Sequence, residues 1–241
     1  MTVRPIYLLS LVVAATFAFA VFHAGQIKSF YIYYQVHAEL APALAQKHLA
    51  WGSPVYIRIF KEEKQLEVWM AHNGHYELFD SYPVCDYSGH LGPKISEGDR
   101  QAPEGFYTVT KKQMVPGSAF HLSFDLGFPN EYDRTNGRTG THLMVHGGCI
   151  SAGCYAITDK EIDKVFSLME AAFENGQAAI PVHIFPFRLA KDNLAKHNNS
   201  RWVQWWTELE PAYDSFEKTE IVPLIMVKDG KYFVSNSSAD Q

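Results

Sequence analysis

One histidine and two cysteines lie close together in the segment His146-Gly-Gly-Cys149-Ile-Ser-Ala-Gly-Cys154, directly after an apolar run. A cysteine attacks an electrophile as the thiolate, and a neighbouring imidazole is a common means of removing the thiol proton. Gly153 allows the tight backbone that a nucleophile at the end of a strand needs. These residue types and their spacing predict Cys154 as a nucleophile and His146 as its base.

Backbone groups beside the cysteine could complete this chemistry. Successive N–H groups around Gly153, Cys154 and Tyr155 could stabilise an oxyanion, and the N-terminus of the following helix would favour the thiolate. No carboxylate that could orient the imidazole is evident in the sequence. We therefore expect a backbone carbonyl near Gly147 to hold the ring.

Polar residues are dense in the loop-like segment 118–140. Tyr132 and Arg134 within it are candidate substrate-binding residues, and His121 is a further candidate for the site. An ordinary solvated loop is the alternative interpretation. The segment therefore predicts one wall of a substrate groove.

The three cysteines leave two pairings open. A disulfide between Cys85 and Cys149 would leave Cys154 reactive, whereas a disulfide between Cys149 and Cys154 would block the chemistry. A zinc site built from His142, His146, Cys149 and Cys154 is a third reading, but on one strand the two histidines would lie ~13 Å apart, too far to bind one ion. A purely structural disulfide cluster and a thiol-redox module are further alternatives, although the chain lacks a C-x-x-C motif.

The active-site signature H-G…S-x-G-C of the L,D-transpeptidase (YkuD-type) catalytic domain resembles His146-Gly147 and the downstream Ser151-Ala-Gly153-Cys154. Ala102-Pro-Glu-Gly-Phe-Tyr107 is similar to the T-P-x-G-x-[FY] element of the same family, with alanine in place of threonine. The compact spacing and the ending C-Y-A resemble the YafK-like branch. Many family members carry an arginine where this chain has Ala156, which leaves the acceptor of the reaction open.

This resemblance, over roughly residues 53–187, implies an enzyme that attacks peptidoglycan stem peptides at the L-centre of diaminopimelate. His146 would activate Cys154, a thioester would form, and Gly147, Ser151, Gly153 and Tyr155 would shape the site. It implies neither a metal nor an organic cofactor. We favour amide hydrolysis, such as release of wall-bound lipoprotein or D-alanine. The alternatives are an L,D-transpeptidase that makes cross-links or lipoprotein attachments, and a non-catalytic cell-wall binding protein.

The N-terminus predicts export. Arg4 precedes an apolar run from Ile6 to Phe22 that ends near an A-x-A-like site, the pattern of a signal peptide that is either cleaved or retained as an inner-membrane anchor. We therefore expect a periplasmic protein. A net charge of −5 argues against nucleic acid as a partner.

Hydrophobic periodicity predicts the elements that position the site. Alternating residues predict a meander of strands at 55–59, 66–70 and 76–84, and an apolar stripe after the capping box Thr158-x-x-Glu161 predicts a helix. We expect a mostly β domain with one prominent helix after the cysteine, α+β overall. The expected divisions are a signal peptide or anchor (1–24), a helical linker interrupted at Pro42 (25–52), the catalytic domain (53–187) and a C-terminal extension (188–241) with Trp202, Trp205 and Trp206 at helical spacing.

Overall fold

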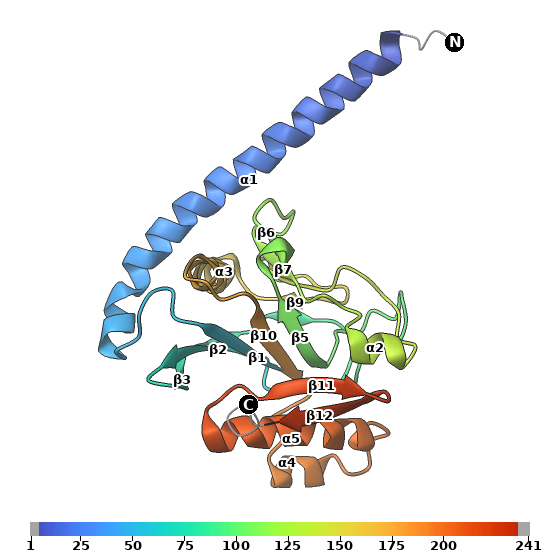
Figure 1. The fold of residues 1–241 in the computed structure, drawn as a ribbon. Coiled ribbons are helices and arrows are strands. Elements are labelled where there is room, and N and C mark those ends of the chain that lie inside the picture. Colours follow the sequence, from blue (N-terminus) through green and yellow to red (C-terminus); the bar gives the residue numbers. More distant parts are fainter. Residues whose placement is uncertain (1–4, 236–241) are drawn as a thin grey trace.

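The computed structural model describes residues 5–235, with side chains from residue 24 onward (Figure 1). The first helix, α1 (Pro5–Gln46), begins inside the predicted leader. The leader or anchor predicted for residues 1–24 therefore lies almost entirely outside the residues whose side chains are described. Among the helices of the described part, none has an apolar stretch long enough to cross a membrane.

Five strands form the first sheet, in the order β3-β2-β1-β10-β5. β1 (Val55–Phe60), β2 (Gln65–His72) and β3 (His75–Pro83) are successive antiparallel neighbours, which confirms the predicted meander. β10 (Ile180–Phe185) runs parallel to β1, and β5 (Gly105–Val109) pairs with β10 at the edge.

The second sheet contains the strands of the His146 and Cys154 segment, in the order β4-β9-β8-β7-β6. Its central strands are β8 (Met144–His146) and β9 (Tyr155–Ala156), which run parallel. β7 (Ser123–Asp125) and β6 (Met114–Val115) extend the sheet on one side, and β4 (Asp86–Tyr87) extends it on the other.

The helix after the cysteine, α3 (Asp159–Glu174), begins as the sequence predicts. The Thr158 side chain accepts a hydrogen bond from the N–H of Glu161, and the Glu161 side chain accepts one from the N–H of Thr158. Its apolar stripe is buried against the first sheet. The smaller helices are α2 (Glu131–Thr135), α4 (Lys191–Lys196) and the 3₁₀ turn η1 (Lys111–Gln113).

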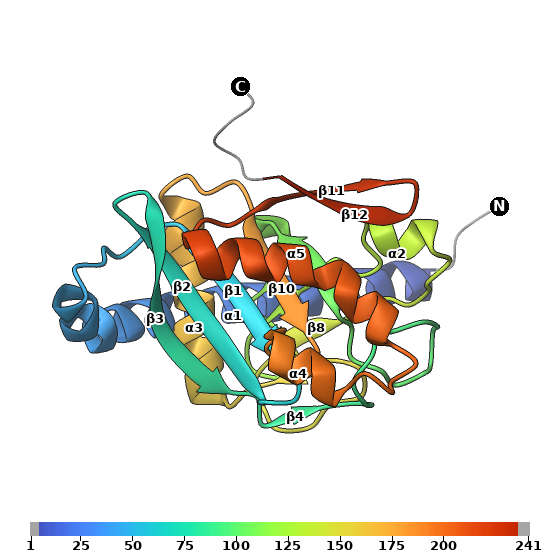
Figure 2. The ribbon, with the colours of Figure 1, turned by 90° about the horizontal axis from the view of Figure 1, so that it is seen from below.

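The first sheet separates two hydrophobic cores. On one face it packs against α1, α3 and the second sheet. On the other face it packs against α5 (Val203–Thr219) and a hairpin of β11 (Leu224–Lys228) and β12 (Lys231–Ser235). Figure 2 shows α5 crossing this face with the hairpin beside it. The predicted mixed α+β fold is confirmed.

A buried ion pair ties the C-terminal helix to the rest of the molecule. Glu104, from the Pro-Glu-Gly element, pairs with Lys61 at 3.1 Å, and both side chains are fully buried. The other Glu104 carboxylate oxygen accepts the indole N–H groups of Trp205 and Trp206, each at 3.0 Å. Trp205 and Trp206 are buried in the second core, and their shared acceptor holds them there.

Two local expectations were wrong. Pro42 does not interrupt a helix, because α1 continues to Gln46 while Leu40 and Leu44 are buried in the first core; packing outweighs the backbone hydrogen bond that proline removes. The segment 118–140 is not only loop, because it contains β7 and α2. Asn130 caps α2 by accepting the N–H of Asp133 at 2.8 Å.

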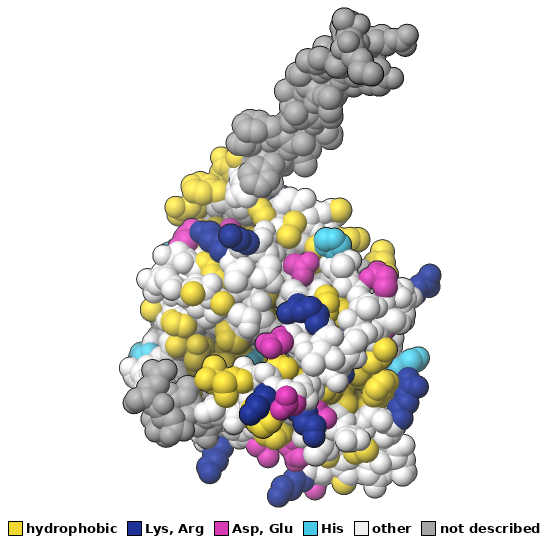
Figure 3. Space-filling view, turned by 45° about the vertical axis from the view of Figure 1, so that its right-hand side comes forward, with side chains coloured by type: hydrophobic (Ala, Val, Ile, Leu, Met, Phe, Trp, Pro, Cys, Tyr) yellow, Lys and Arg dark blue, Asp and Glu magenta, His cyan; other side chains and the backbone are white. Residues whose placement is uncertain are grey.

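One face of α1 carries exposed hydrophobic side chains directly after the undescribed ones: Ile27, Phe30, Tyr31 and Tyr34. Figure 3 shows hydrophobic side chains gathered where the helix leaves the body. The opposite face of the helix is buried, with Val36, Leu40 and Leu44 in the first core.

Candidate active site

Strand register brings His146 and Cys154 to one face of the second sheet. Val145 pairs with Tyr155 and His146 with Ala156 on the parallel strands β8 and β9, so Cys154 lies beside Met144. Side chains alternate along a strand, so Cys154 shares a face with His146. Val145 and Tyr155 point the other way, into the first core. The predicted nucleophile and base therefore lie on the same face of the second sheet.

A backbone carbonyl orients the His146 ring. Nδ1 lies 2.6 Å from the carbonyl oxygen of Gly147, and the residue is 3% exposed. A carbonyl only accepts hydrogen bonds, so Nδ1 carries the proton and Nε2 keeps its lone pair. This tautomer is the one that a general base needs, and the expected carbonyl near Gly147 is the one observed.

Gly147 has no room for a side chain. A Cβ there would lie 2.6 Å from Oδ1 of Asp159 and 2.8 Å from the carbonyl oxygen of Phe120. The next N–H, from Gly148, donates to Oδ1 of Asp159 at 2.9 Å. The turn after His146 is thus fixed by the first turn of α3 on one side and by residue 120 on the other.

The surroundings of Cys154 favour its protonated thiol form. Burial raises the pKa of Cys154, the hydrogen bond from the Met144 N–H to its Sγ opposes this, and the Asp125 carboxylate adds to the rise. The charge of Lys94 lowers this pKa, and the effect predicted for the N-terminus of α3 stays a prediction. The thiol needs a base to remove its proton, which is the role predicted for His146.

Hydrogen bonds fix the turn before Cys154. Ser151 Oγ donates to the carbonyl of Cys154 at 2.7 Å, and its N–H donates to Asp86 at 2.7 Å. The Gly153 N–H, expected to stabilise an oxyanion, donates to Ser88 Oγ at 2.9 Å, so that amide is already occupied. The oxyanion role remains a prediction for the amides of Cys154 and Tyr155. Gly153 has a φ of +128°, which favours glycine.

Sequence reasoning missed Asp86 and Ser88. Both lie in or next to β4, far from the cysteine in the chain, and nothing in their local pattern marks them. The available signal was their closeness to Cys85, which forms a disulfide with Cys149. That bond brings β4 to the turn before Cys154.

The same disulfide settles the pairing left open by the sequence. Cys154 is the free cysteine. Cys149, one of the considered zinc ligands, is therefore unavailable as a thiolate. The described residues contain no group of three or more potential metal ligands.

The three proposed substrate-binding residues fall in different places. Tyr132 is buried in the second core, stacked on Tyr232 at 4.2 Å between ring centroids, so its ring is not open to a substrate. Arg134 is exposed on α2 and donates to the carbonyl of Pro129. His121 lies beside the site, because its Cβ is 3.0 Å from the position that a Cβ added to Gly147 would take.

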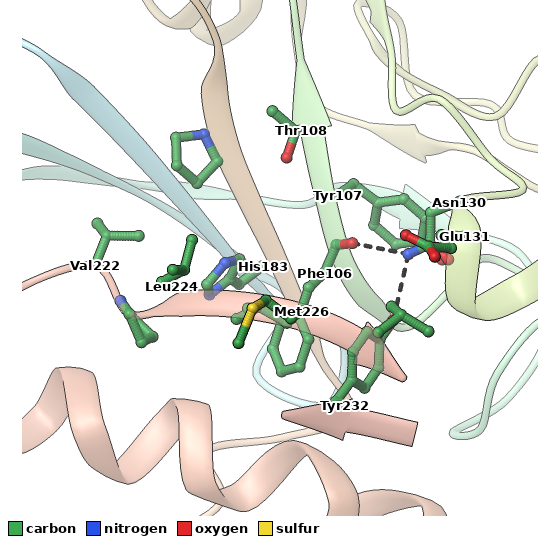
Figure 4. Close-up of a pocket in the computed structure, with 14 residues that line it drawn as sticks. Phe106, Tyr107, Thr108, Asn130, Glu131, His183, Val222, Leu224, Met226 and Tyr232 are labelled. Atoms are coloured by element: carbon green, nitrogen blue, oxygen red, sulfur yellow. Dashed lines mark hydrogen bonds between the residues drawn. The ribbon is translucent and has the colours of Figure 1, made fainter. Parts of the chain in front are cut away.

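A groove of about 600 Å³ lies elsewhere, between β5, β10 and β11 (Figure 4). In Figure 4 Asn130 bridges the carbonyl of Phe106 and the hydroxyl of Tyr232, at 2.8 and 3.3 Å. The lining of the groove includes neither His146 nor Cys154. It belongs to the interface with the C-terminal hairpin.

Sequence comparison finds close relatives. No family model matches the chain. It is 45% identical over 189 residues to the proteins described as "Putative L,D-transpeptidase YafK" in Escherichia coli K12 and in Escherichia coli O157:H7, and each alignment covers 78% of this chain and 77% of the relative.

Solved structures also match. The helical cell shape determining protein Pgp2 from Campylobacter jejuni matches 72% of this chain with a TM-score of 0.45 and 21% identity. Bdellovibrio bacteriovorus Bd1075 matches 67% with a TM-score of 0.40 and 24% identity. The chain spans 66% of Pgp2 and 60% of Bd1075.

Proposed function

Because this chain belongs to the YafK-like L,D-transpeptidase family, we propose that it is an exported cysteine enzyme acting on peptidoglycan stem peptides in the periplasm. The observation that carries the proposal is the parallel register of β8 and β9, which sets a free thiol and an oriented imidazole on one face. The disulfide between Cys85 and Cys149 supports an oxidising compartment.

The first half-reaction uses His146 as base. Nε2 takes the Cys154 proton while Sγ attacks the carbonyl carbon at the L-centre of the diaminopimelate residue, and the former carbonyl oxygen becomes an oxyanion. The amides of Cys154 and Tyr155 stabilise that charge. When the tetrahedral intermediate collapses, the C–N bond breaks and the leaving amine takes the proton from His146, which leaves a thioester on Cys154.

The second half-reaction decides between hydrolysis and transfer. His146 takes a proton from water or from an acceptor amine, the resulting nucleophile displaces Cys154, and the thiol is regenerated. We favour water. The position two residues after Cys154 is a fully buried alanine, Ala156, so no guanidinium stands there to hold a charged acceptor. Release of wall-bound lipoprotein or of D-alanine would follow.

The test compares the full chain and its variants on peptidoglycan that carries bound lipoprotein, with mass spectrometry of the soluble products. We expect Cys154→Ala and His146→Ala to abolish product formation. His142→Ala is the matched control, because this neighbouring histidine is 81% exposed and its replacement should retain activity.

The products separate the candidate functions. Shortened stem peptides or freed lipoprotein would support hydrolysis, and new cross-links or amine-exchanged stems would support a transferase instead. Binding to the wall by all variants with no new product from any of them would contradict an enzyme and favour a cell-wall binding protein.

A further inference from the structure

Residues 116–121, here called the covering loop, lie against the catalytic histidine. The Phe120 ring packs on the His146 imidazole, with centroids 4.6 Å apart and an angle of 31° between the planes. Phe120 is 50% exposed, so it covers the histidine without being part of a core.

The covering loop is seated tightly on the turn after His146. The Phe120 carbonyl and the His121 Cβ fill the space that a side chain at Gly147 would need. The carbonyl of Gly147 also accepts the hydrogen bond from Nδ1–H of His146. A displacement of the covering loop would therefore expose the face of the His146 imidazole to solvent. It would also loosen the turn at Gly147, whose carbonyl orients that ring.

His121 fixes the covering loop between two helices. Its Nδ1 lies 2.8 Å from Lys28 Nζ on α1, and its Nε2 lies 2.6 Å from Asp163 Oδ1 on α3. An ammonium only donates, so Nδ1 accepts and Nε2–H donates to the carboxylate. Asp159 faces the same ring, with Oδ2 3.9 Å from Nδ1.

The backbone of α1 also touches the covering loop. A Cβ on Gly25 would lie 2.8 Å from the Cα of Gly117. The helix can come this close because Gly25 has no side chain, whereas a Cβ on Gly117 would meet no atom within 4 Å. Thus α1 contacts the covering loop at two places, through the backbone at Gly25 and through the side chain of Lys28.

We propose that α1 positions the catalytic base: through Gly25 and Lys28 it holds the covering loop so that Phe120 clamps His146 beside Cys154. This rests on the proposed function, because it assigns Phe120, Lys28 and His121 as positioning residues for that chemistry. Phe120 keeps water off the imidazole and limits its rotation, while Lys28 and Asp163 hold His121 and hence the loop. The positioning residues Phe120, Lys28 and His121 need not touch the substrate.

The experiment measures alkylation of Cys154 by iodoacetamide against pH in the full chain, where Cys154→Ala gives the background. We expect Phe120→Ala to lower the rate constant at neutral pH by about tenfold, as expected when a general base is misplaced. Phe120→Tyr, which keeps the ring, should restore it. Lys28→Gln should also lower the rate constant at neutral pH, and Lys28→Arg should keep most of the native rate. At strongly alkaline pH, where the thiolate forms without a base, all variants should converge.

The outcomes separate this inference from the proposed function. If His146→Ala slows alkylation at neutral pH while Phe120→Ala and Lys28→Gln match the native protein, the positioning role is wrong and the catalytic pair stands. If His146→Ala itself matches the native protein, the base assignment fails, and the positioning role fails with it. Because Phe120 is half-exposed, unchanged melting temperatures are expected and exclude loss of folding as the cause.

Discussion

Ser88 accepts the N–H of Gly153 through its hydroxyl at 2.9 Å, directly before the nucleophile in the chain. The same hydroxyl donates to Ser151 Oγ at 3.1 Å, and Ser151 Oγ donates to the carbonyl of Cys154. Ser88, which directly follows the β4 strand held by the disulfide, therefore sets the path of the backbone on both sides of the turn.

Replacement of Ser88 should reduce catalysis more than stability. In Ser88→Ala the Gly153 N–H loses its acceptor and the turn loosens, so we expect turnover to fall about tenfold and the free energy of unfolding by about 1 kcal/mol. Ser88→Thr keeps a hydroxyl and serves as the control. The measurement is initial rate of product release beside urea unfolding. A faster enzyme would indicate instead that Gly153 serves as an oxyanion donor once it is freed.

The buried ion pair between Lys61 and Glu104 should be intolerant of single changes. Burial lowers the pKa of Lys61, and the Glu104 carboxylate opposes this. Glu104→Gln removes the counter-charge, and we expect a loss of about 3 kcal/mol in the free energy of unfolding. The double variant Lys61→Met, Glu104→Gln should recover part of that loss, because no uncompensated charge remains. Denaturant titration of the native protein, the single variants Glu104→Gln and Lys61→Met and the double variant decides, and a double variant less stable than both single variants would contradict this account.

Glu170 on α3 should make stability depend on pH. Burial and the carboxylate of Glu174 raise its pKa to about 7 from an ordinary 4.5, with Lys111 in opposition. Because the pKa is raised, Glu170 stays protonated in the folded protein at pH values at which it is already ionised in the unfolded chain. Stability is therefore full below about pH 4.5 and falls as the pH rises through about 7. We expect Glu170→Gln to remove this decline and to add about 1 kcal/mol above neutral pH, since partial contact with water weakens the effect. Melting temperatures across pH test this, and an equal gain at acidic pH would speak against it.

Thiol counting should verify the disulfide. Cys154 is the free cysteine among the three of the chain, so we expect one thiol to react with Ellman's reagent in the native protein and three after reduction and unfolding. The Cys85–Cys149 bond closes a sequence separation of 64 residues, and its removal in a double alanine variant should cost about 2–4 kcal/mol. A native protein without any reactive thiol would mean that Cys154 is itself oxidised.

Local patterns predicted much of the fold. The meander from Val55 and the α3 capping box at Thr158 were predictable because alternation and capping depend on residues close in sequence. The short β7 and β9 were not, since strands of two or three residues carry no periodicity. Their existence depends on pairing with β8, which only the folded chain provides.

The candidate site also contains residues that local sequence patterns could predict and residues that only tertiary packing brings in. His146, Cys154 and the Gly147 carbonyl are close in the chain, so the sequence could propose all three. Phe120, Ser88 and Asp163 reach the site through tertiary packing, and their own surroundings in the sequence give no sign of it. Tyr132 was misassigned because a polar segment suggested exposure, whereas Trp205 and Tyr232, far along the chain, bury it.

The contact between Gly25 and Gly117 lies directly after the segment predicted as a leader, residues 1–24. Gly25 and Lys28 follow Ala18 and Ala20, the small residues at which a leader could be cut. A chain trimmed there and a chain that keeps its leader would carry the same helical segment over the histidine. On the export prediction, removal or retention of the segment before Gly25 would therefore leave the contacts that hold Phe120 against His146 unchanged.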